Sequence, residues 1–321
     1  MKYAIGVDLG GTNIAVGIVD GERREIVHKE SIKTRAPRPC KEIAQDICDL
    51  SRTVCEHYGI TLSEVAWVGV GTPGIVKDGV VLTASNLGWN NDPLGEYIKE
   101  GLKVPCYVGN DANVAAFAEA IWGSGHGDPS LVAITLGTGV GGGIVINGKI
   151  WDGFNGFAAE LGHVIVDAEG RECGCGKRGC LEAYCSATAL IRESKRMMGL
   201  YKDSVMWQIV GGDLGKVDGK TAFDAAAQGD FAAKVVVDSF IHYLAVGVSN
   251  MINIFQPHVV CIGGGVSRQG DALLLPLRRQ VESMSFGYHQ GRTRVEIAAY
   301  QNDAGIIGAA LLGIQEKTNT F

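Results

Sequence analysis

Residues able to bind a metal gather in one short segment, 160–182, which reads ELGHVIVDAEGRECGCGKRGCLE. His163 offers an imidazole, and Cys173, Cys175 and Cys180 offer three thiolates. This ligand set suits a closed tetrahedral zinc site. The glycines between the cysteines let the backbone turn tightly enough for the sulfurs to converge. The segment therefore predicts a Zn²⁺ site, and since four protein ligands leave no position for water, the zinc would be structural rather than catalytic.

Two other states of these cysteines stay open, a disulfide and free or reactive thiols. The chain has nine cysteines, an odd number, and those outside the cluster are scattered. Its N-terminus also does not resemble a signal peptide, which favours a reducing, cytoplasmic location. Clustered cysteines in such a compartment more often bind metal than form a disulfide.

A glycine turn near the N-terminus could hold a phosphate. The apolar run Tyr3–Val7 ends at Asp8, and Gly10, Gly11, Thr12 and Asn13 lead into a second apolar run. Glycines let backbone N–H groups approach a phosphate, and the two polar residues add side-chain donors. Asp8 could hold Mg²⁺, which favours a carboxylate together with phosphate oxygens. An ordinary hairpin with a glycine turn remains the alternative.

The same pattern returns later in the chain. Leu131–Leu136 is strand-like and leads through a glycine-rich turn, which includes Thr138 and Gly139, into the apolar run Ile144–Ile146. Two such hairpins predict a duplicated fold that offers one phosphate-binding turn from each half. A further glycine cluster, which contains Gly264 and Gly265, follows the apolar strand His258–Ile262 and could approach a flat ligand such as adenine.

Two polar positions could contact a substrate. Asp111 lies where the strand Val104–Val108 gives way to an alanine-rich helix, Val114–Trp122. It could be the helix N-cap or a general base, because an N-terminal position also keeps a carboxylate ionised. Asn86 lies in the loop SNLGW, which suits the hydroxyls and apolar face of a sugar, although a plain surface loop fits equally well.

The remaining patterns predict a mixed α/β protein. Amphipathic spacing indicates a helix over Cys40–Tyr58, and alanine content with apolar spacing indicates helices over Ala187–Met198 and Thr221–Asn253. The segment 199–219 has no assignable pattern. Further strands are expected at Ile26–Ile32, Val65–Gly69 and Val295–Ala299, a hairpin at Ile75–Leu82 and a last helix at Ala304–Ile314.

Length and charge set limits on the class of protein. A chain of 321 residues with 46% hydrophobic residues exceeds one compact domain, so two are expected. Its net charge of −6 argues against a nucleic-acid-binding surface. The sequence has no apolar run near the roughly 18 residues of a membrane span, so no membrane partner is expected.

Taken in order, the motifs DLGGTN, GVGTPG, SNLGW, GNDANVAA, TLGTGVGGG, ELGH, CGCGKRGCLE and CIGGGVS resemble the ROK family of repressors and sugar kinases, and within it the bacterial glucokinases. The resemblance covers essentially the whole chain. It implies an actin-like (ribonuclease H-like) two-domain ATPase fold with a duplicated core, and ATP and a hexose bound in an interdomain cleft. The smaller lobe would comprise 1–120 and about 303–321, and the larger lobe, 121–302, would carry the zinc loop.

The resemblance also implies roles for single residues. Asp111 matches the catalytic base, and Asn86, Asn110, Glu160, His163 and Glu182 match positions that contact the sugar. His163 would then bind zinc through one ring nitrogen and the sugar through the other. A homodimer or a dimer of dimers is expected by the same resemblance.

Three classes of function compete: a hexose kinase, a sugar-responsive repressor and a sensor without turnover. Because Asp8 lies so near the start, a preceding helix-turn-helix domain is not expected, which disfavours the repressor. Because Asp8, the first glycine turn and Asp111 are all present, a sensor is also disfavoured. Glucose is the expected substrate, while N-acetylmannosamine, fructose, mannose and allose kinases share the motifs.

Overall fold

The computed structural model describes residues 2–287 and 293–318. The chain forms two compact units. The first contains Met1–Ser130, Gly143–Ala159 and Tyr300–Phe321, and the second contains Leu131–Gly142 and Glu160–Ala299. The lobe boundaries expected near 120 and 302 stay a prediction, and the contacts group 143–159 with the first unit.

The first unit is built on a five-stranded sheet with the order β3-β2-β1-β4-β8. Strand β1 pairs with β2 antiparallel and with β4 parallel, and β4 pairs with β8 parallel. The central strands are apolar almost throughout because both faces of the sheet are covered. The bounds are β1 Tyr3–Leu9, β2 Asn13–Asp20, β3 Glu25–Lys33, β4 Val65–Thr72 and β8 Cys106–Asn110.

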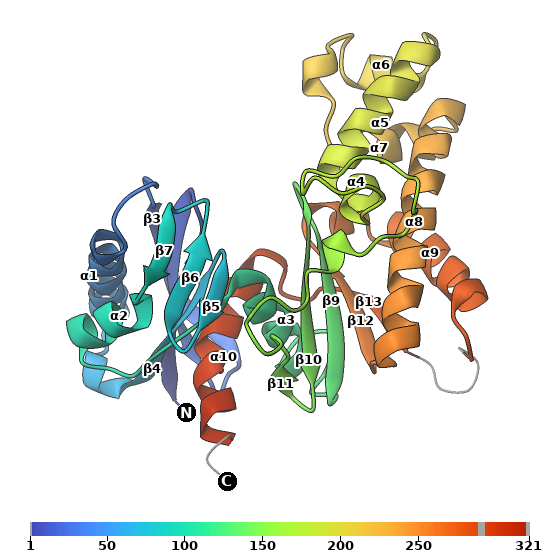
Figure 1. Ribbon diagram of the computed structural model, residues 1–321. Helices are drawn as coiled ribbons and strands as arrows, with labels where there is room; N and C mark the ends of the chain where they lie inside the picture. The colour runs from blue at the N-terminus through green and yellow to red at the C-terminus, as the bar shows by residue number, and fades with distance from the viewer. Residues whose placement is uncertain (1, 288–292, 319–321) are drawn as a thin grey trace. The chain divides into compact units, whose positions relative to one another are not determined.

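Helices cover both faces of this sheet (Figure 1). Helices α1 (Cys40–Tyr58) and α2 (Leu94–Leu102) pack on one face, and α10 (Ala304–Thr318) and α3 (Asp111–Ile121) lie on the other. Helix α10 approaches β1 so closely that a Cβ added at Gly6 would lie 1.9 Å from the Ile306 carbonyl oxygen. The predicted helices Cys40–Tyr58 and Ala304–Ile314 are confirmed.

A small antiparallel sheet, β5-β6-β7, follows β4 in the chain. It contains β5 (Ile75–Lys77), β6 (Val80–Ala84) and β7 (Trp89–Asp92). Asp78 and Gly79 join β5 to β6 with φ angles of 50° and 79°, the left-handed conformation that tight hairpin turns require. This confirms the predicted hairpin and leads into the loop that contains Asn86.

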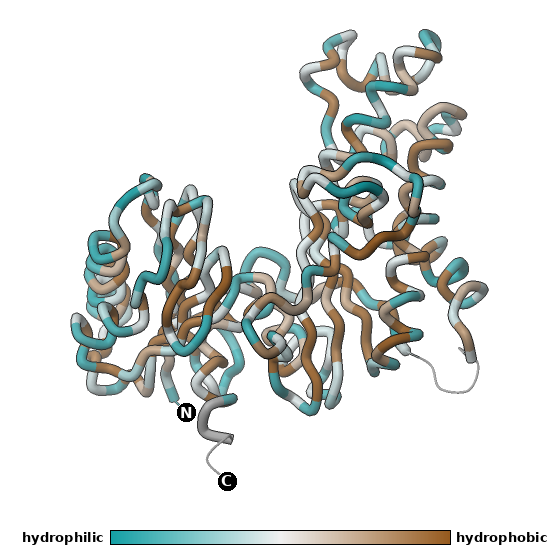
Figure 2. Tube along the Cα trace, in the orientation of Figure 1, coloured by the Kyte–Doolittle hydropathy of each residue, from teal (hydrophilic) through white to brown (hydrophobic). Residues whose placement is uncertain are grey.

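The second sheet has the order β11-β10-β9-β12-β13, and β12 is parallel to both β9 and β13. Its order repeats that of the first sheet position by position, so the predicted duplication is confirmed. Strands β9 and β12 are largely hydrophobic (Figure 2). The bounds are β9 Ser130–Leu136, β10 Val140–Ile146, β11 Lys149–Ile150, β12 Val259–Gly263 and β13 Arg294–Ile297.

Helices form the rest of the second unit. Helix α8 contacts α9, α7, α5 and the short α4. The α-helices are α4 Glu182–Cys185, α5 Ala187–Leu200, α6 Val205–Ile209, α7 Thr221–Ala227, α8 Phe231–Phe255 and α9 Asp271–Met284. Single 3₁₀ turns are η1 Leu62–Glu64, η2 Leu161–His163, η3 Leu214–Lys216, η4 Gly265–Gln269 and η5 Gln301–Asp303.

The helical region predicted over Thr221–Asn253 is two helices, not one. Gly229, with φ of 90°, interrupts it, and the Asp230 side chain caps α8 by accepting from Ala233 N. The unassigned segment 199–219 contains α6 and η3. Helices α2 and α9 were not foreseen. Helix α2 has only 9 residues, and α9 contains Pro276, a residue that ordinarily argues against a helix interior.

Helix α8 corrects the expectation about apolar runs. An 18-residue window of α8 has a mean hydropathy of 1.5, so by length and composition this helix could cross a membrane. Lys234 and Asp238 interrupt its apolar sequence, which is why the sequence showed no continuous run. The core helix of a protein can satisfy the same criteria of length and composition. Because 56% of the window is buried among the neighbouring elements, α8 has the character of such a core helix.

Candidate functional site

The four predicted metal ligands converge in the second unit. One ligand atom from each of His163, Cys173, Cys175 and Cys180 lies within 4.8 Å of all the others. His163 Nδ1 is 3.8 Å from Cys173 Sγ, and Cys175 Sγ is 3.7 Å from Cys180 Sγ. Cys173 and Cys180 are buried, whereas Cys175 is exposed. The four donors of this short segment are thus gathered as their spacing predicted.

These distances fit zinc and do not fit a disulfide. Sulfurs about 2.3 Å from a tetrahedral ion lie about 3.8 Å apart, whereas bonded sulfurs lie about 2.05 Å apart. All nine cysteines are free. Burial raises the pKa of Cys173 and raises that of Cys180 to about 12, whereas a hydrogen bond from the Lys177 backbone lowers the pKa of Cys175. A bound cation would offset the cost of burying the thiolates.

Local backbone geometry builds this cluster. Cys173 N donates to Lys177 O at 2.8 Å, and Gly176 N donates to Cys173 O at 3.0 Å, which closes a tight loop around Cys175. Gly179 has φ of 76°, and a Cβ there would lie 1.7 Å from the Asp167 carbonyl oxygen. Position 179 therefore requires glycine. We call residues 163–182 the knuckle.

The knuckle reaches the second glycine turn through Glu182. This residue begins α4, and its Oε2 accepts from the backbone N–H of Val140 at 3.0 Å. A Cβ added at Gly139 would lie 2.4 Å from the same oxygen. The Oε1 atom accepts from Cys173 Sγ at 3.6 Å. Gly139, predicted to approach nucleotide, is therefore packed against Glu182, which was predicted to bind sugar.

The chain just before the knuckle has an unusual conformation. Glu160 is exposed, and its backbone carbonyl accepts from His163 N at 3.0 Å. The residue before it, Ala159, is buried with φ of 65°, a left-handed conformation that costs energy for any residue with a Cβ. No sequence signal marked Ala159, because alanine is ordinarily a helix former.

The structure separates the two roles considered for Asp111. The N-cap of α3 is Asn110, whose Oδ1 accepts from Ala112 N at 3.0 Å and from Asn113 N at 3.1 Å. Its Nδ2 donates to Gly74 O at 2.9 Å. Both acceptor sites of the Asn110 oxygen are used, so only an Nδ2 hydrogen is left for a sugar. Asp111 is the first helical residue, so it is not the cap.

Two carboxylates of the first unit influence one another. Burial raises the pKa of Asp111, although the Ala112 N–H, 2.8 Å from its Oδ1, opposes the rise. Burial, and then the negative charge of Asp111, raise the pKa of Asp8 to about 6. Two like charges in a half-buried place fit a divalent cation such as Mg²⁺, which would relieve their repulsion.

The first glycine turn is open. Gly10 N donates to Asn13 O at 2.9 Å, and Gly11, Thr12 and Asn13 are exposed. A Cβ added at Gly11 would meet Cβ of Asn86 at 3.7 Å, so the turn lies beside the predicted sugar loop. Asn86 itself is exposed.

Thr34 supports the first turn and was missed by the sequence. Its buried hydroxyl donates to Gly10 O at 2.6 Å, and its backbone N–H donates to Thr12 O at 3.0 Å. It follows the turn by more than twenty residues, on the segment after β3. No local signal in the sequence links such distant positions.

The remaining predicted nucleotide residues lie in the second unit. Gly264 has φ of 81°, and a Cβ there would lie 2.5 Å from Leu136 O. Gly265 begins η4 with no atom within 4 Å of an added Cβ. Thr138 is exposed, and its carbonyl accepts from Thr188 Oγ1 at 2.7 Å.

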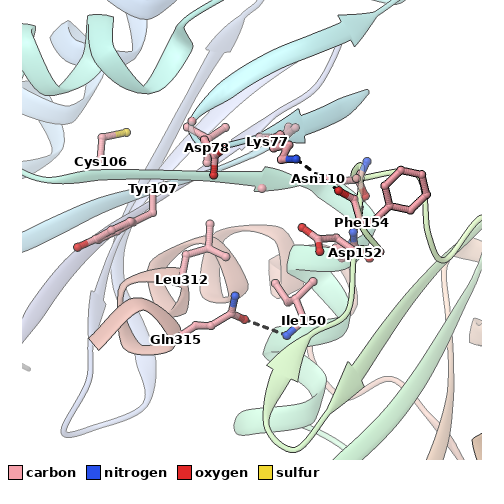
Figure 3. A pocket seen from close by; sticks show the side chains of 17 residues that line it. Lys77, Asp78, Cys106, Tyr107, Asn110, Ile150, Asp152, Phe154, Leu312 and Gln315 are labelled. Atoms are coloured by element: carbon pink, nitrogen blue, oxygen red, sulfur yellow. Dashed lines mark hydrogen bonds between the residues drawn. The ribbon is translucent and has the colours of Figure 1, made fainter. Parts of the chain in front are cut away.

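A cavity of about 430 Å³ lies within the first unit (Figure 3). Its wall includes Asn110 but not Asp111. Two hydrogen bonds connect the surrounding elements, from Lys77 Nζ to Phe154 O at 3.3 Å and from Ile150 N to Gln315 Oε1 at 2.9 Å. These bonds tie the end of β5 and helix α10 to the segment that follows β10.

The sequence is similar to proteins of known family. The sequence matches the ROK family over residues 4–316. The chain belongs to the ROK family. It is 37% identical to the glucokinase of Halalkalibacterium halodurans over 99% of this chain and 97% of that protein. It is 38% identical to the glucokinase of Thermotoga maritima over 98% and 97% of the two chains.

The structures of ROK proteins agree with the fold. A ROK family glucokinase from Streptomyces griseus, solved with glucose and AMPPNP, superposes with a TM-score of 0.78 and 35% identity over 97% of this chain and 98% of that chain. The predicted ROK resemblance and the actin-like, two-domain α/β fold are thus confirmed.

The predicted site residues are divided between the two units. Asp8, the first glycine turn, Asn86, Asn110 and Asp111 belong to the first unit. The second unit holds Thr138, Gly139, Glu160, the zinc ligands, Glu182, Gly264 and Gly265. Within each unit the structure places a glycine turn beside a carboxylate.

Proposed function

We propose that this ROK protein is an ATP-dependent sugar kinase that phosphorylates glucose to glucose 6-phosphate. The observation that carries the proposal is the full-length similarity to glucokinases, including one solved with glucose and a nucleotide analogue. The separation of Asn110 as cap from Asp111 supports the assignment of Asp111 as general base.

The proposed reaction balances simply. The primary hydroxyl oxygen of the sugar forms a bond to the γ-phosphorus of ATP, and the bond from that phosphorus to the bridging oxygen of ADP breaks. Asp111 accepts the hydroxyl proton. Because the transition state of phosphoryl transfer is loose, positioning and charge neutralisation contribute most of the catalysis.

We assign the other residues by their chemistry. Gly10, Gly11, Thr12 and Asn13 of the first turn, with Thr138, Gly139, Gly264 and Gly265, would contact the nucleotide. Asp8 would hold Mg²⁺, which neutralises phosphate charge when bound. Asn86, Asn110, Glu160, His163 and Glu182 would hydrogen-bond the sugar hydroxyls. A carboxylate that the bound sugar covers but leaves unpaired, because a hydroxyl is missing, would give the selectivity among sugars.

Zinc would be held by His163, Cys173, Cys175 and Cys180. The donor distances support this assignment. The ion would keep the knuckle folded. The folded knuckle would in turn hold Glu182, its last residue, in place. We further propose a cytoplasmic location, a part in glycolysis, and a homodimer or a dimer of dimers. Light scattering on the purified protein measures the oligomeric state.

A coupled assay tests the activity. The purified protein is supplied with ATP or polyphosphate and with glucose, mannose, fructose, allose or N-acetylmannosamine. The proposal expects the highest kcat/KM with ATP and glucose. A higher value with another sugar would reassign the substrate, and no turnover with any pair would contradict the kinase.

A pair of neighbouring variants tests the base. Asp111→Asn should lower kcat by about 10²–10⁴ without lowering the melting temperature, because Asn110 still caps α3 and a buried charge is removed. Asn110→Ala should instead cost about 0.5–2 kcal/mol of stability by removing the cap. Near-normal turnover in Asp111→Asn would show that another group takes the proton.

The zinc assignment is tested in the knuckle. Cys175 is exposed, so Cys175→Ser should release zinc without disturbing a core, and weaken sugar affinity more than ATP affinity. Gly174→Ala is the matched control, because nothing lies within 4 Å of its added Cβ. Elemental analysis should find one zinc per chain in wild type and control. Retention of zinc by Cys175→Ser would remove Cys175 from the ligand set.

A further inference from the structure

A second cluster of metal-binding side chains lies in the first unit. His28 and Glu30 lie on β3, and His57 lies in the last turn of α1. One ligand atom from each residue lies within 4.8 Å of the other two. None of the three belongs to the glycine turns, to the sugar residues or to the knuckle.

The two imidazoles face the same carboxylate oxygen. Glu30 Oε1 lies 3.0 Å from His28 Nε2 and 2.6 Å from His57 Nδ1. Donor atoms about 2.0–2.2 Å from one ion and at right angles to each other lie about 2.8–3.1 Å apart. To bind a metal, each imidazole would release the hydrogen that faces Glu30, through a change of tautomer or loss of a proton to solvent. Small side-chain shifts would then place two histidines and one carboxylate around a transition-metal ion.

The backbone arranges this convergence. His28 and Glu30 are two residues apart on one strand, so they share a face. The pairing of β2 with β3 shifts between Ile18, opposite His28, and Val19, opposite Ile26, which leaves Val27 as an extra residue. Such a bulge changes the direction of neighbouring side chains. Tyr58 stacks on the His28 ring, with centroids 6.5 Å apart, and restricts its orientation.

Charge at this place favours a cation. Among residues 2–287 and 293–318, the ion-pair partners of Glu30 are the two imidazoles and not a lysine or an arginine. Glu30 supplies a carboxylate, which is negatively charged at neutral pH. His57 also lies at the C-terminal end of α1, where the helix dipole is negative.

We propose that His28, Glu30 and His57 form a second metal site, which binds a divalent transition ion such as Ni²⁺, Cu²⁺ or Zn²⁺ at the junction of β3 and α1. The side chains are half-buried or exposed, with 57% exposure at His57, so the ion can reach them from solvent and keep water as its other ligands. Bound metal would join the end of α1 to the edge strand β3.

Titration of the untagged, zinc-loaded protein with Ni²⁺ tests the proposal. Calorimetry should detect one Ni²⁺ per chain, while a zinc indicator shows that the knuckle keeps its own ion. His57→Gln and Glu30→Gln should each weaken Ni²⁺ binding by at least about tenfold. His126→Gln is the matched control, because it removes an exposed imidazole of the same unit.

Spectroscopy and stability provide a second measurement. Bound Cu²⁺ should show electron-spin couplings to two imidazole nitrogens in wild type and to one in His57→Gln. Saturating Ni²⁺ should raise the melting temperature of wild type and His126→Gln but not of His28→Gln/His57→Gln. If that double variant binds Ni²⁺ as tightly as wild type, the cluster is only a hydrogen-bonded ion pair and the proposal is wrong.

Discussion

The turn at Gly10–Gly11 and the turn at 137–139 occupy equivalent places in two sheets of the same strand order, yet their surroundings differ. The first joins β1 to β2, and its glycines have at least 3.4 Å of space around an added Cβ. The second joins β9 to β10, and Gly139 is closed off by the Glu182 carboxylate. Equivalent places in a duplicated fold therefore need not have equivalent roles.

Each turn has a carboxylate beside it, but the two carboxylates come from different parts of the chain. Asp8 comes from the strand that leads into its own turn. Glu182 comes from the end of the knuckle and binds the backbone N–H of Val140. The second turn is further held by α5, whose first residue Ala187 donates to Gly137 O at 2.8 Å. The first turn is thus suited to a ligand, while the second also positions a side chain.

The largest effect that this difference predicts is at Gly139. Gly139→Val should displace Glu182, because the added Cβ would lie 2.4 Å from its Oε2. Loss of a hydrogen bond to a charged group costs about 1.5–3 kcal/mol, so we expect the KM for sugar to rise on the order of 10–100-fold. Steady-state kinetics with each substrate varied in turn measure this.

Gly10→Val is the matched substitution in the first turn. It should raise the KM for ATP more than that for sugar, because among the described residues only the backbone oxygen of Asn13 lies within 4 Å of its added Cβ. If Gly139→Val and Gly10→Val raise the KM for the same substrate to the same degree, the two turns are functionally alike, and the difference inferred between them is wrong.

An intermediate effect concerns pH and the carboxylate of the first turn. Folding raises the pKa of Asp8 from 3.8 to about 6, so the folded protein holds a proton that the unfolded chain releases between these values. Ionised Asp8 therefore opposes folding above about pH 6, and this cost disappears below about pH 4. Asp8→Asn should raise the melting temperature by a few degrees at pH 7.5, since about 1 kcal/mol corresponds to roughly 2–4 °C.

Thermal unfolding of wild type and Asp8→Asn without Mg²⁺, at pH 4 and 7.5, checks this prediction. The difference between the two proteins should be much smaller at pH 4. In wild type, the affinity for Mg²⁺–nucleotide should also fall as the pH drops through about 6, because protonated Asp8 holds the cation poorly. An equal difference at both pH values would contradict the raised pKa.

The smallest effect is expected from Gly10→Ala. Its added Cβ would have Asn13 O as nearest neighbour at 3.4 Å, an ordinary contact, so the fold should be kept and the KM for ATP should change only a few-fold. A large loss of thermal stability would show that the first turn is as closely packed as the second.

Local sequence determined the elements and the donor chemistry of this protein. Alternation and apolar runs predicted the strands from Tyr3, Leu131 and His258, because burial on both faces requires hydrophobic residues there. The spacing of Cys173, Cys175 and Cys180 predicted their convergence, because a glycine-rich loop of so few residues brings its own ends together. Resemblance in the ordered motifs then gave the family and the fold.

Tertiary structure decided what depends on partners far apart in the chain. It made Asn110 rather than Asp111 the cap of α3, because the Asn110 amide also reaches Gly74 across neighbouring strands. It placed Gly139 against Glu182, and Thr34 behind Gly10, through contacts that no local pattern encodes. His28, Glu30 and His57 likewise meet only because β3 lies beside the end of α1. Sequence fixes which chemical groups exist, whereas packing fixes which of them meet.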